Sequence, residues 1–270
     1  MGPDELAFPL VPRGRLTGLP FGGLPSWRRG RGSDVAGSRP YRPGDDFDLI
    51  DWASSARRSA ARGSDEFVVR EQFAEEAPRV VVIADRRPAM ALYPPELPFL
   101  DKRETLRVAM AMIAAAAGAA RGLLGYLDFG DGDAGDPFWV APRSRSDDWL
   151  LEHRWRDPRF EAPEDNVELA LEWVGRLRGA LPAGSFLFVL SDFISGPPPE
   201  VWWTALEHRW DIVPVVVQDP AWEQSFPELA GIVLPVLDAT DGRYMPVRLR
   251  RREARERRVQ NERLFEGGHA

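Results

Sequence analysis

Two aspartates stand at positions where carboxylates could hold a metal ion. Asp85 directly follows the β-branched run of residues 79–84, and Asp192 directly follows the apolar run of residues 185–191. Both runs are typical of strands that are buried on both faces of a sheet. Because ligands of open parallel sheets bind outside the carboxyl ends of the strands, we expect both carboxylates at one edge. Two like charges there need a cation, and oxygen ligands suit Mg²⁺ or Mn²⁺.

The elements that must position these aspartates alternate between strand and helix patterns. The sequence predicts helices at residues 100–121, 166–179, 199–208 and 250–265, and strands at residues 79–85, 123–129, 138–141, 185–192, 211–218, 231–237 and 243–249. Strands that alternate with helices predict an α/β fold, here a doubly wound, mostly parallel sheet with helices on both faces.

The first part of the chain has a different composition. It is rich in Gly, Pro and Arg, which favours turns and short strands, and residues 66–73 alternate well enough for one strand. We therefore predict three parts. These are an N-terminal Gly/Pro-rich, β-containing module at residues 1–76, an α/β domain at residues 77–249, and an arginine-rich C-terminal helix and tail at residues 250–270.

Residues 39–57 carry a resemblance to a known family. They read RPYRPGDDFDLIDWASSAR and follow a Gly-rich lead-in at residues 29–32. This segment resembles the signature of the bacterial domain of unknown function 58 family, and the resemblance extends over residues 18–218. That family joins the signature to a von Willebrand factor A-like domain, which Asp85 after its strand and the sequence Ser191-Asp192-Phe193 also resemble. The signature residues are Arg39, Tyr41, Gly44, Asp45, Asp46, Ile50, Asp51, Trp52 and Arg57.

The resemblance implies a function as well as a fold. Members are usually encoded next to a MoxR-type AAA+ ATPase, so the resemblance implies assembly or chaperone-like work with such an ATPase. The predicted function is a non-enzymatic protein-interaction or assembly factor. The alternative is a divalent-metal-dependent ligand-binding von Willebrand A domain. The oligomeric state stays open.

The metal site that the resemblance implies is degenerate in this sequence. Its pattern is Asp-x-Ser-x-Ser, then a Thr, then an Asp, but here Arg87 and Ala89 stand at the two serine positions after Asp85. Asp165 falls near the Thr position, and Asp192 matches the last Asp. Since a guanidinium is always charged and pairs with carboxylates, we hypothesise that Arg87 neutralises all three acids in place of a metal. The alternatives are an Arg87 that points into solvent and residual Mg²⁺ binding.

The signature segment has two interpretations. Its carboxylates and arginines could form a binding surface for a partner. Alternatively, it is a hydrogen-bonded loop in which Gly44 adopts a turn conformation while Ile50 and Trp52 pack on the sheet. We favour the second interpretation from the sequence.

Composition and missing motifs exclude several classes of protein. The chain has 270 residues, a net charge of -7 and no cysteine, which excludes disulfides and thiolate chemistry. An acidic chain is a poor nucleic-acid binder, and neither Walker A, Gly-x-Gly-x-x-Gly nor Gly-x-Ser-x-Gly motifs occur. We therefore expect no enzyme activity and no cofactor. Because residues 1–16 lack an apolar core and no apolar run could span a bilayer, we expect a cytoplasmic protein.

Overall fold

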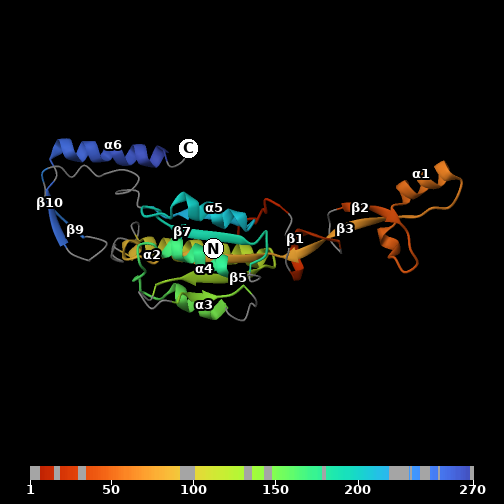
Figure 1. Ribbon diagram of the computed structural model, residues 1–270, viewed down its shortest axis with the longest axis horizontal. Helices are drawn as coiled ribbons and strands as arrows, with labels where there is room; N and C mark the ends of the chain where they lie inside the picture. The colour runs from red at the N-terminus through yellow and green to blue at the C-terminus, as the bar shows by residue number, and fades with distance from the viewer. Residues whose placement is uncertain are drawn as a thin grey trace.

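A mixed α/β body with a five-stranded sheet forms the centre of the computed structural model (Figure 1). The structure describes residues 7–14, 19–29, 35–91, 101–130, 136–142, 148–177, 181–218, 231, 233–237, 244–248 and 250–267. The strand order is β6-β5-β4-β7-β8. The four parallel strands are β4 (Arg79–Ala84), β5 (Leu123–Asp128), β7 (Phe186–Ser191) and β8 (Asp211–Val216), and the antiparallel edge strand is β6 (Phe138–Val140). The predicted mixed fold with a mostly parallel sheet is confirmed.

Helices cover both faces of this sheet because alternate residues of the central strand β4 point to opposite sides. Val80 and Val82 face one apolar cluster, which contains Met110 of α2 (Lys102–Ala119). Val81 faces the other cluster, with Val174 of α4 (Asn166–Arg176) and residues of α5 (Pro199–Glu207). A short helix that the sequence did not predict, α3 (Asp148–Trp155), packs on the α2 side.

The N-terminal module is a separate antiparallel sheet that extends from one end of the body (Figure 1). Its order is β1-β3-β2, with β1 at Leu19–Arg29, β2 at Val35–Pro40 and β3 at Val68–Ala77. Between β2 and β3 lie a 3-10 turn, η2 (Phe47–Leu49), and a helix, α1 (Trp52–Arg62). The prediction of a loop was therefore wrong for residues 52–57, which lie in a helix capped by Asp51.

The last two strands do not join the five-stranded sheet. Strands β9 (Val233–Leu237) and β10 (Tyr244–Arg248) pair only with each other, as an antiparallel hairpin, in the part of the chain that the structure describes. The strands predicted at residues 231–237 and 243–249 are thus present, as β9 and β10. The chain continues into α6 (Arg251–Gly267), close to the predicted C-terminal helix. Among the described residues, no helix combines the length and apolar character that a membrane crossing requires.

Candidate functional site

Three neighbouring parallel strands end in aspartates at the same edge of the sheet. Asp85 follows β4, Asp192 follows β7, and Asp128 is the last residue of β5. All three side chains are buried. The loop after β4 carries two adjacent arginines, Arg86 and Arg87, whose side chains are also buried. This edge therefore concentrates opposite charges inside the protein.

Arg87 connects two of the three aspartates. Its Nη2 atom lies 2.7 Å from Asp85 Oδ2 and 2.6 Å from Asp192 Oδ1, while its Nε atom lies 3.0 Å from Asp85 Oδ2. The backbone N–H of Arg87 also donates to Asp85 Oδ1 at 3.0 Å. With 2% of its side chain exposed, Arg87 lies between carboxylates and does not point into solvent.

Neutral and cationic donors complete the network. Asn166 Nδ2 donates to Asp85 Oδ1 at 3.1 Å, and Ser191 Oγ donates to Asp85 Oδ2 at 2.6 Å. Lys102 Nζ, at the start of α2, donates to Asp192 Oδ2 at 3.1 Å. Four carboxylate oxygens therefore have partners from three different elements. Satisfying a buried carboxylate in this way removes most of the penalty for taking it out of water.

The third acid of the network is Glu164, whereas Asp165 was predicted. Arg87 Nη1 lies 3.1 Å from Glu164 Oε2, and the Glu164 side chain is half exposed. Asp165 precedes α4 as its N-cap residue but makes no side-chain capping hydrogen bond. The predicted pairing of Arg87 with Asp165 was wrong. The polypeptide turns just before α4, and this turn brings Glu164 to the Arg87 guanidinium instead. Ala89 lies in the short 3-10 helix η3 (Pro88–Ala91) and carries no polar side-chain atom.

Electrostatics keep Arg87 ionised. Burial disfavours the charged guanidinium, but hydrogen bonds from it to Asp85 and the charges of Asp85 and Asp192 outweigh that penalty. The pKa of Arg87 consequently lies above its ordinary value. Two cations, Arg87 and Lys102, face two buried carboxylates, and the half-exposed Glu164 adds a third. A nearly neutral cluster of this kind has little electrostatic demand for a further cation.

Asp128 has its own arginine partners. Arg154 of α3 binds it with two nitrogens, Nε at 2.9 Å and Nη2 at 2.5 Å, and Arg86 Nη1 lies 3.5 Å from its Oδ2. Arg86 also donates to the carbonyl oxygens of Arg154 and Asp157 and stacks over the Phe160 ring. Arg86 and Arg87, adjacent in the loop after β4, thus pair with the aspartates at the ends of β5, β4 and β7.

Sequence reasoning missed Lys102, Asp128, Asn166 and Glu164. Two of them left a signal. Asp128 is the penultimate residue of the strand predicted at residues 123–129, so the argument that placed Asp85 and Asp192 at the sheet edge applies to it as well. Lys102 is the only lysine in a chain whose other basic residues are arginines. Glu164 and Asn166 lie in an irregular segment, where no periodic pattern fixes the direction of a side chain.

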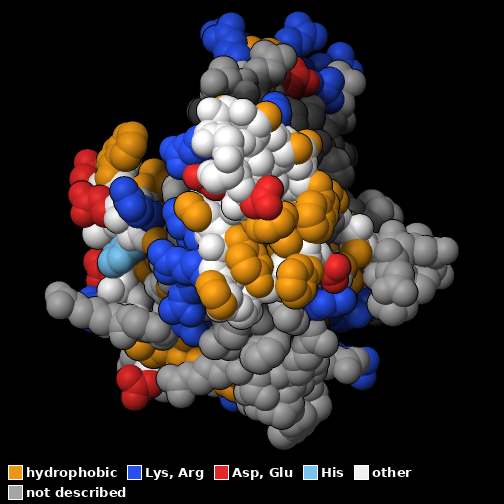
Figure 2. Space-filling model, turned by 90° about the vertical axis from the view of Figure 1, so that its right-hand side faces the viewer, with side chains coloured by type: hydrophobic (Ala, Val, Ile, Leu, Met, Phe, Trp, Pro, Cys, Tyr) orange, Lys and Arg blue, Asp and Glu red, His pale blue; other side chains and the backbone are white. Residues whose placement is uncertain are grey.

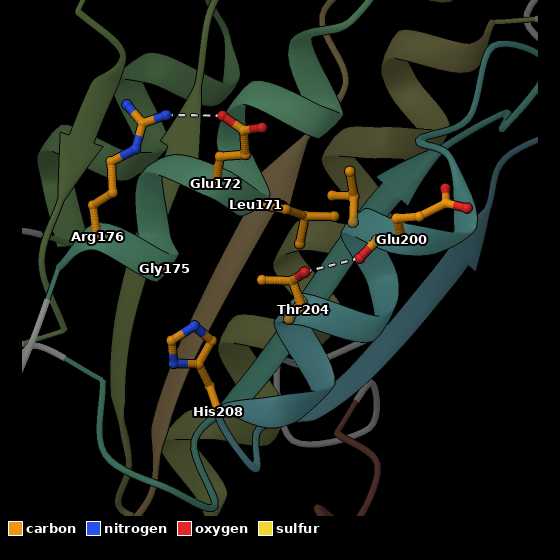
Figure 3. Close-up of a pocket in the computed structure, with 9 residues that line it drawn as sticks. Leu171, Glu172, Gly175, Arg176, Glu200, Thr204 and His208 are labelled. Carbon is orange, nitrogen blue, oxygen red and sulfur yellow. Dashed lines mark hydrogen bonds and ion pairs between the residues drawn. The ribbon is translucent and has the colours of Figure 1, made fainter.

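The described residues contain no group of three or more His, Asp or Glu side chains arranged to hold a metal ion. A shallow groove of about 420 Å³ lies between α4 and α5 (Figure 3). Its polar side chains bond within their own helices, Arg176 to Glu172 at 2.8 Å and the Thr204 hydroxyl to the Glu200 carbonyl oxygen at 2.9 Å. His208 stacks on the Trp210 ring. The groups around this groove do not converge on a common point where a substrate could react.

The signature segment forms a tightly bonded turn. Arg39 pairs with Asp45 through two hydrogen bonds of 2.6 Å, and the backbone N–H of Arg42 donates to Asp45 at 2.7 Å. Gly44 has a φ of 99°, a conformation that favours glycine. The hydrogen bond from Arg39, followed by that from Arg42, lowers the pKa of Asp45 to about 2 from 3.8. These observations agree with the structural interpretation of the first half of the segment.

The second half of the segment caps and anchors α1. Asp46 accepts a hydrogen bond from the backbone N–H of Asp48, and Asp51 accepts one from that of Ser54, which lowers the pKa of Asp51. Ser55 Oγ in turn accepts from the backbone N–H of Val68 in β3 at 2.9 Å. Two of the signature carboxylates therefore serve as helix and turn caps.

Two apolar signature residues differ sharply in burial. Ile50, only 3% exposed, forms a β-bridge with Val69, as expected for a residue that packs on the sheet. Trp52 is 61% exposed, so the expectation that it packs on the sheet was wrong. The Arg57 guanidinium makes its hydrogen bonds to neutral oxygens, the Ala53 carbonyl and the Ser54 hydroxyl. The Gly-rich lead-in lies mostly outside the described residues, which omit 30–34.

Comparison with known proteins identifies one family. The model of the family described as "Protein of unknown function DUF58" matches residues 37–264, most of the chain. The crystal structure of an aerotolerance-related membrane protein from Bacteroides fragilis NCTC 9343, with multiple mutations to serines, has a TM-score of 0.40 and 13% sequence identity. That likeness covers 69% of this chain and 89% of the other. No curated protein matches the chain at a significant level.

Proposed function

The chain belongs to the family described as Protein of unknown function DUF58, and we propose that it is a non-enzymatic protein-binding or assembly factor. In this proposal the α/β body is a von Willebrand factor A-like domain whose metal site is degenerate. The arrangement of β4 between β5 and β7, with helices on both faces and acids at the strand ends, supports that assignment.

One observation carries the proposal. The Arg87 guanidinium contacts Asp85 and Asp192 at 2.7 and 2.6 Å, where a divalent cation would need those same oxygens. A divalent cation bound to those oxygens would lie at short range from the buried guanidinium, and the two positive charges would repel each other strongly. Arg87 thus serves as a permanent internal counterion. Without an open coordination position, the edge offers neither a Lewis acid nor a metal-held ligand.

Magnesium titration by calorimetry tests this role of Arg87. We expect no stoichiometric binding of Mg²⁺ to the wild-type chain at micromolar concentration. The double variant Arg87→Ser/Ala89→Ser restores the two hydroxyls and removes the counterion, so it is expected to gain affinity for Mg²⁺. A stoichiometric micromolar site in the wild type that disappears on Asp85→Ala would instead support a metal-dependent ligand-binding domain.

The proposed partner is a MoxR-type AAA+ ATPase in the cytoplasm, on the strength of the family resemblance. A pull-down from the native cell, with the wild type and Arg87→Ser/Ala89→Ser side by side, tests this partner. We expect the wild type to recover the ATPase, identified by mass spectrometry. Recovery of no ATPase with either protein would contradict the proposed partnership.

A further inference from the structure

Helix α1 presents its apolar side to solvent and its polar side to the protein. Ser55 accepts from the backbone N–H of Val68 in β3 at 2.9 Å, and Ser59 accepts from that of Glu66, just before β3, at 2.9 Å. Its apolar residues are exposed instead: Trp52, Ala53, Ala56, Ala60 and, farther around the helix, Ala61. A surface helix normally buries its apolar face against the core, so this orientation is inverted.

The exposed face of α1 continues into a group of aromatic rings. The Trp52 ring meets Phe67 edge-on at 6.0 Å, Phe67 meets Tyr41 at 6.4 Å, and Tyr41 stacks on Phe47 at 6.0 Å. Phe47 and Phe67 are 68% and 45% exposed. We call the following residues the apolar patch: Phe47, Trp52, Ala53, Ala56, Ala60 and Phe67. In Figure 2, which looks onto this end of the molecule, hydrophobic side chains gather at the centre with charged side chains around them.

A continuous exposed surface of this kind is typical of a contact site for another molecule. Aromatic residues dominate the energy of such contacts. Ala56 and Ala60 lie about one and two helical turns after Trp52, and their small side chains leave room for a second backbone to approach closely. The patch lies on the module opposite the hairpin end of the body in Figure 1, away from the strand-end network. A ligand bound here would not depend on that network.

The charges on α1 decide between possible occupants. The helix carries three arginines and no carboxylate in its sequence WASSARRSAAR. Arg58 and Arg62 pair with Glu66, but the hydrogen bonds of Arg57 go to neutral oxygens only. Arg57 borders the patch beside Ala53, one helical turn away. Two copies of α1 packed face to face would bring these arginines together without an acidic counterpart on either helix, which disfavours self-association.

We infer that the apolar patch binds an amphipathic helix of a partner protein, whose apolar side covers Trp52 and Ala56 and whose flanking carboxylate pairs with Arg57. Apolar contact supplies the affinity and the ion pair selects acidic partners over basic ones. The inference rests on the proposed protein-binding function and adds the surface and the chemistry of the partner.

A peptide-binding experiment on the full chain tests the patch. The probe is a fluorescein-labelled synthetic helix of about 20 residues, long enough to be helical, with leucines on one face and glutamates beside them. A second probe has lysines in place of the glutamates. Fluorescence anisotropy is expected to show saturable binding of the glutamate probe and at least about tenfold weaker binding of the lysine probe. Absence of saturable binding of the glutamate probe would overturn the inference.

Matched variants locate the binding surface. Ala56→Arg places a bulky polar group in the patch. We expect this variant to bind the glutamate probe about tenfold or more weakly than the wild type, despite the added positive charge. Ala61→Arg is the control, because Ala61 is exposed on the same helix about 140° around its axis from Ala56. Arg57→Glu is expected to reverse the preference between the two probes. Equal binding by the two arginine variants, or an unchanged preference in Arg57→Glu, would contradict the inference. If thermal unfolding shows Ala56→Arg to be misfolded, Ala60→Arg replaces it.

Two further measurements separate other occupants and the proposed function. Self-association in sedimentation that Ala56→Arg abolishes would assign the patch to a second copy, and binding to phosphatidylglycerol vesicles that Ala56→Arg abolishes would assign it to a membrane. Either result would overturn the inference. If Ala56→Arg still recovers the ATPase from cells, the patch is not its site although the proposed function stands. If the wild type recovers none but binds the glutamate probe, the proposed partnership fails and the patch stands.

Discussion

At the carboxyl edge of the five-stranded sheet, charged side chains are buried and bonded to one another, whereas on α1 apolar side chains lie in solvent. The first arrangement uses Arg87 and Lys102 to neutralise buried aspartates. The second leaves Trp52 more than half exposed at the start of a helix that is attached through serines. Clusters of buried charges are often functional sites, so the first region has the more familiar signature of function. We assign a stabilising role to the buried charges at the sheet edge, and we propose recognition for the exposed apolar side chains on α1.

Removal of Arg87 tests the stabilising role of the first region and has the largest expected effect. Arg87→Met leaves Asp85 and Asp192 buried with Lys102 as their nearest cation, so the free energy of unfolding is expected to fall by about 3–5 kcal/mol. Denaturant titration measures that loss. Arg87→Lys, which keeps the charge but has one donor nitrogen in place of three, is expected to lose less. If the denaturation midpoint of Arg87→Met equalled that of the wild type, the network would contribute no net stability.

Ile50 and Trp52 sharpen the contrast within the signature segment. Ile50→Ala removes a buried side chain, and we expect the free energy of unfolding to fall by about 2–4 kcal/mol. Trp52→Ser removes an exposed ring whose described ring contact is the edge of Phe67, so a loss below about 1.5 kcal/mol is expected. Thermal unfolding of both variants and the wild type at one pH measures the two losses of stability. Equal losses would mean that Trp52 contributes to the core as much as Ile50 does.

Acidification probes the exposed turn of the signature segment and has the smallest expected effect. The pKa of Asp45 is about 2 in the folded chain and 3.8 ordinarily, so its ion pair with Arg39 stabilises the turn above pH 3.8. That contribution is lost as the pH falls through about 2. Carboxyl NMR shifts of Asp45 measure the titration directly. Arg39→Gln is expected to move the midpoint upward, and an unchanged midpoint would contradict the pairing.

Sequence patterns predicted the strand-end aspartates because strands buried on both faces are continuous apolar runs, and each run ends at an aspartate. The direction of Asp85 and Asp192 follows from strand ends in a parallel sheet, so the pairing with Arg87 could be hypothesised from residue types alone. The third acid was misassigned by one residue, since Glu164 and Asp165 lie in an irregular turn with no period. Such one-residue errors are expected wherever the backbone direction depends on tertiary contacts.

Helix α1 escaped prediction for a different physical reason. Its apolar residues face solvent, so the usual inference from apolar spacing to a buried helical face led away from it. A local signal was nevertheless present, because Asp51 stands at a position where its carboxylate can accept a backbone N–H, as N-cap residues do. Alanine and arginine, which are good helix formers, together with a capping aspartate would have predicted the helix, although not the side that it exposes.

The Arg87–Asp192 contact also has a kinetic consequence. The two residues are 105 positions apart in the chain, and β5, α3 and α4 all lie between them. Until β7 docks beside β4, the guanidinium and its acids must stay hydrated, because burying them unpaired costs several kcal/mol. Closure of so long a loop is slow relative to local helix formation. We therefore expect docking of β7 to be a late step of folding, at which the edge of the sheet dehydrates.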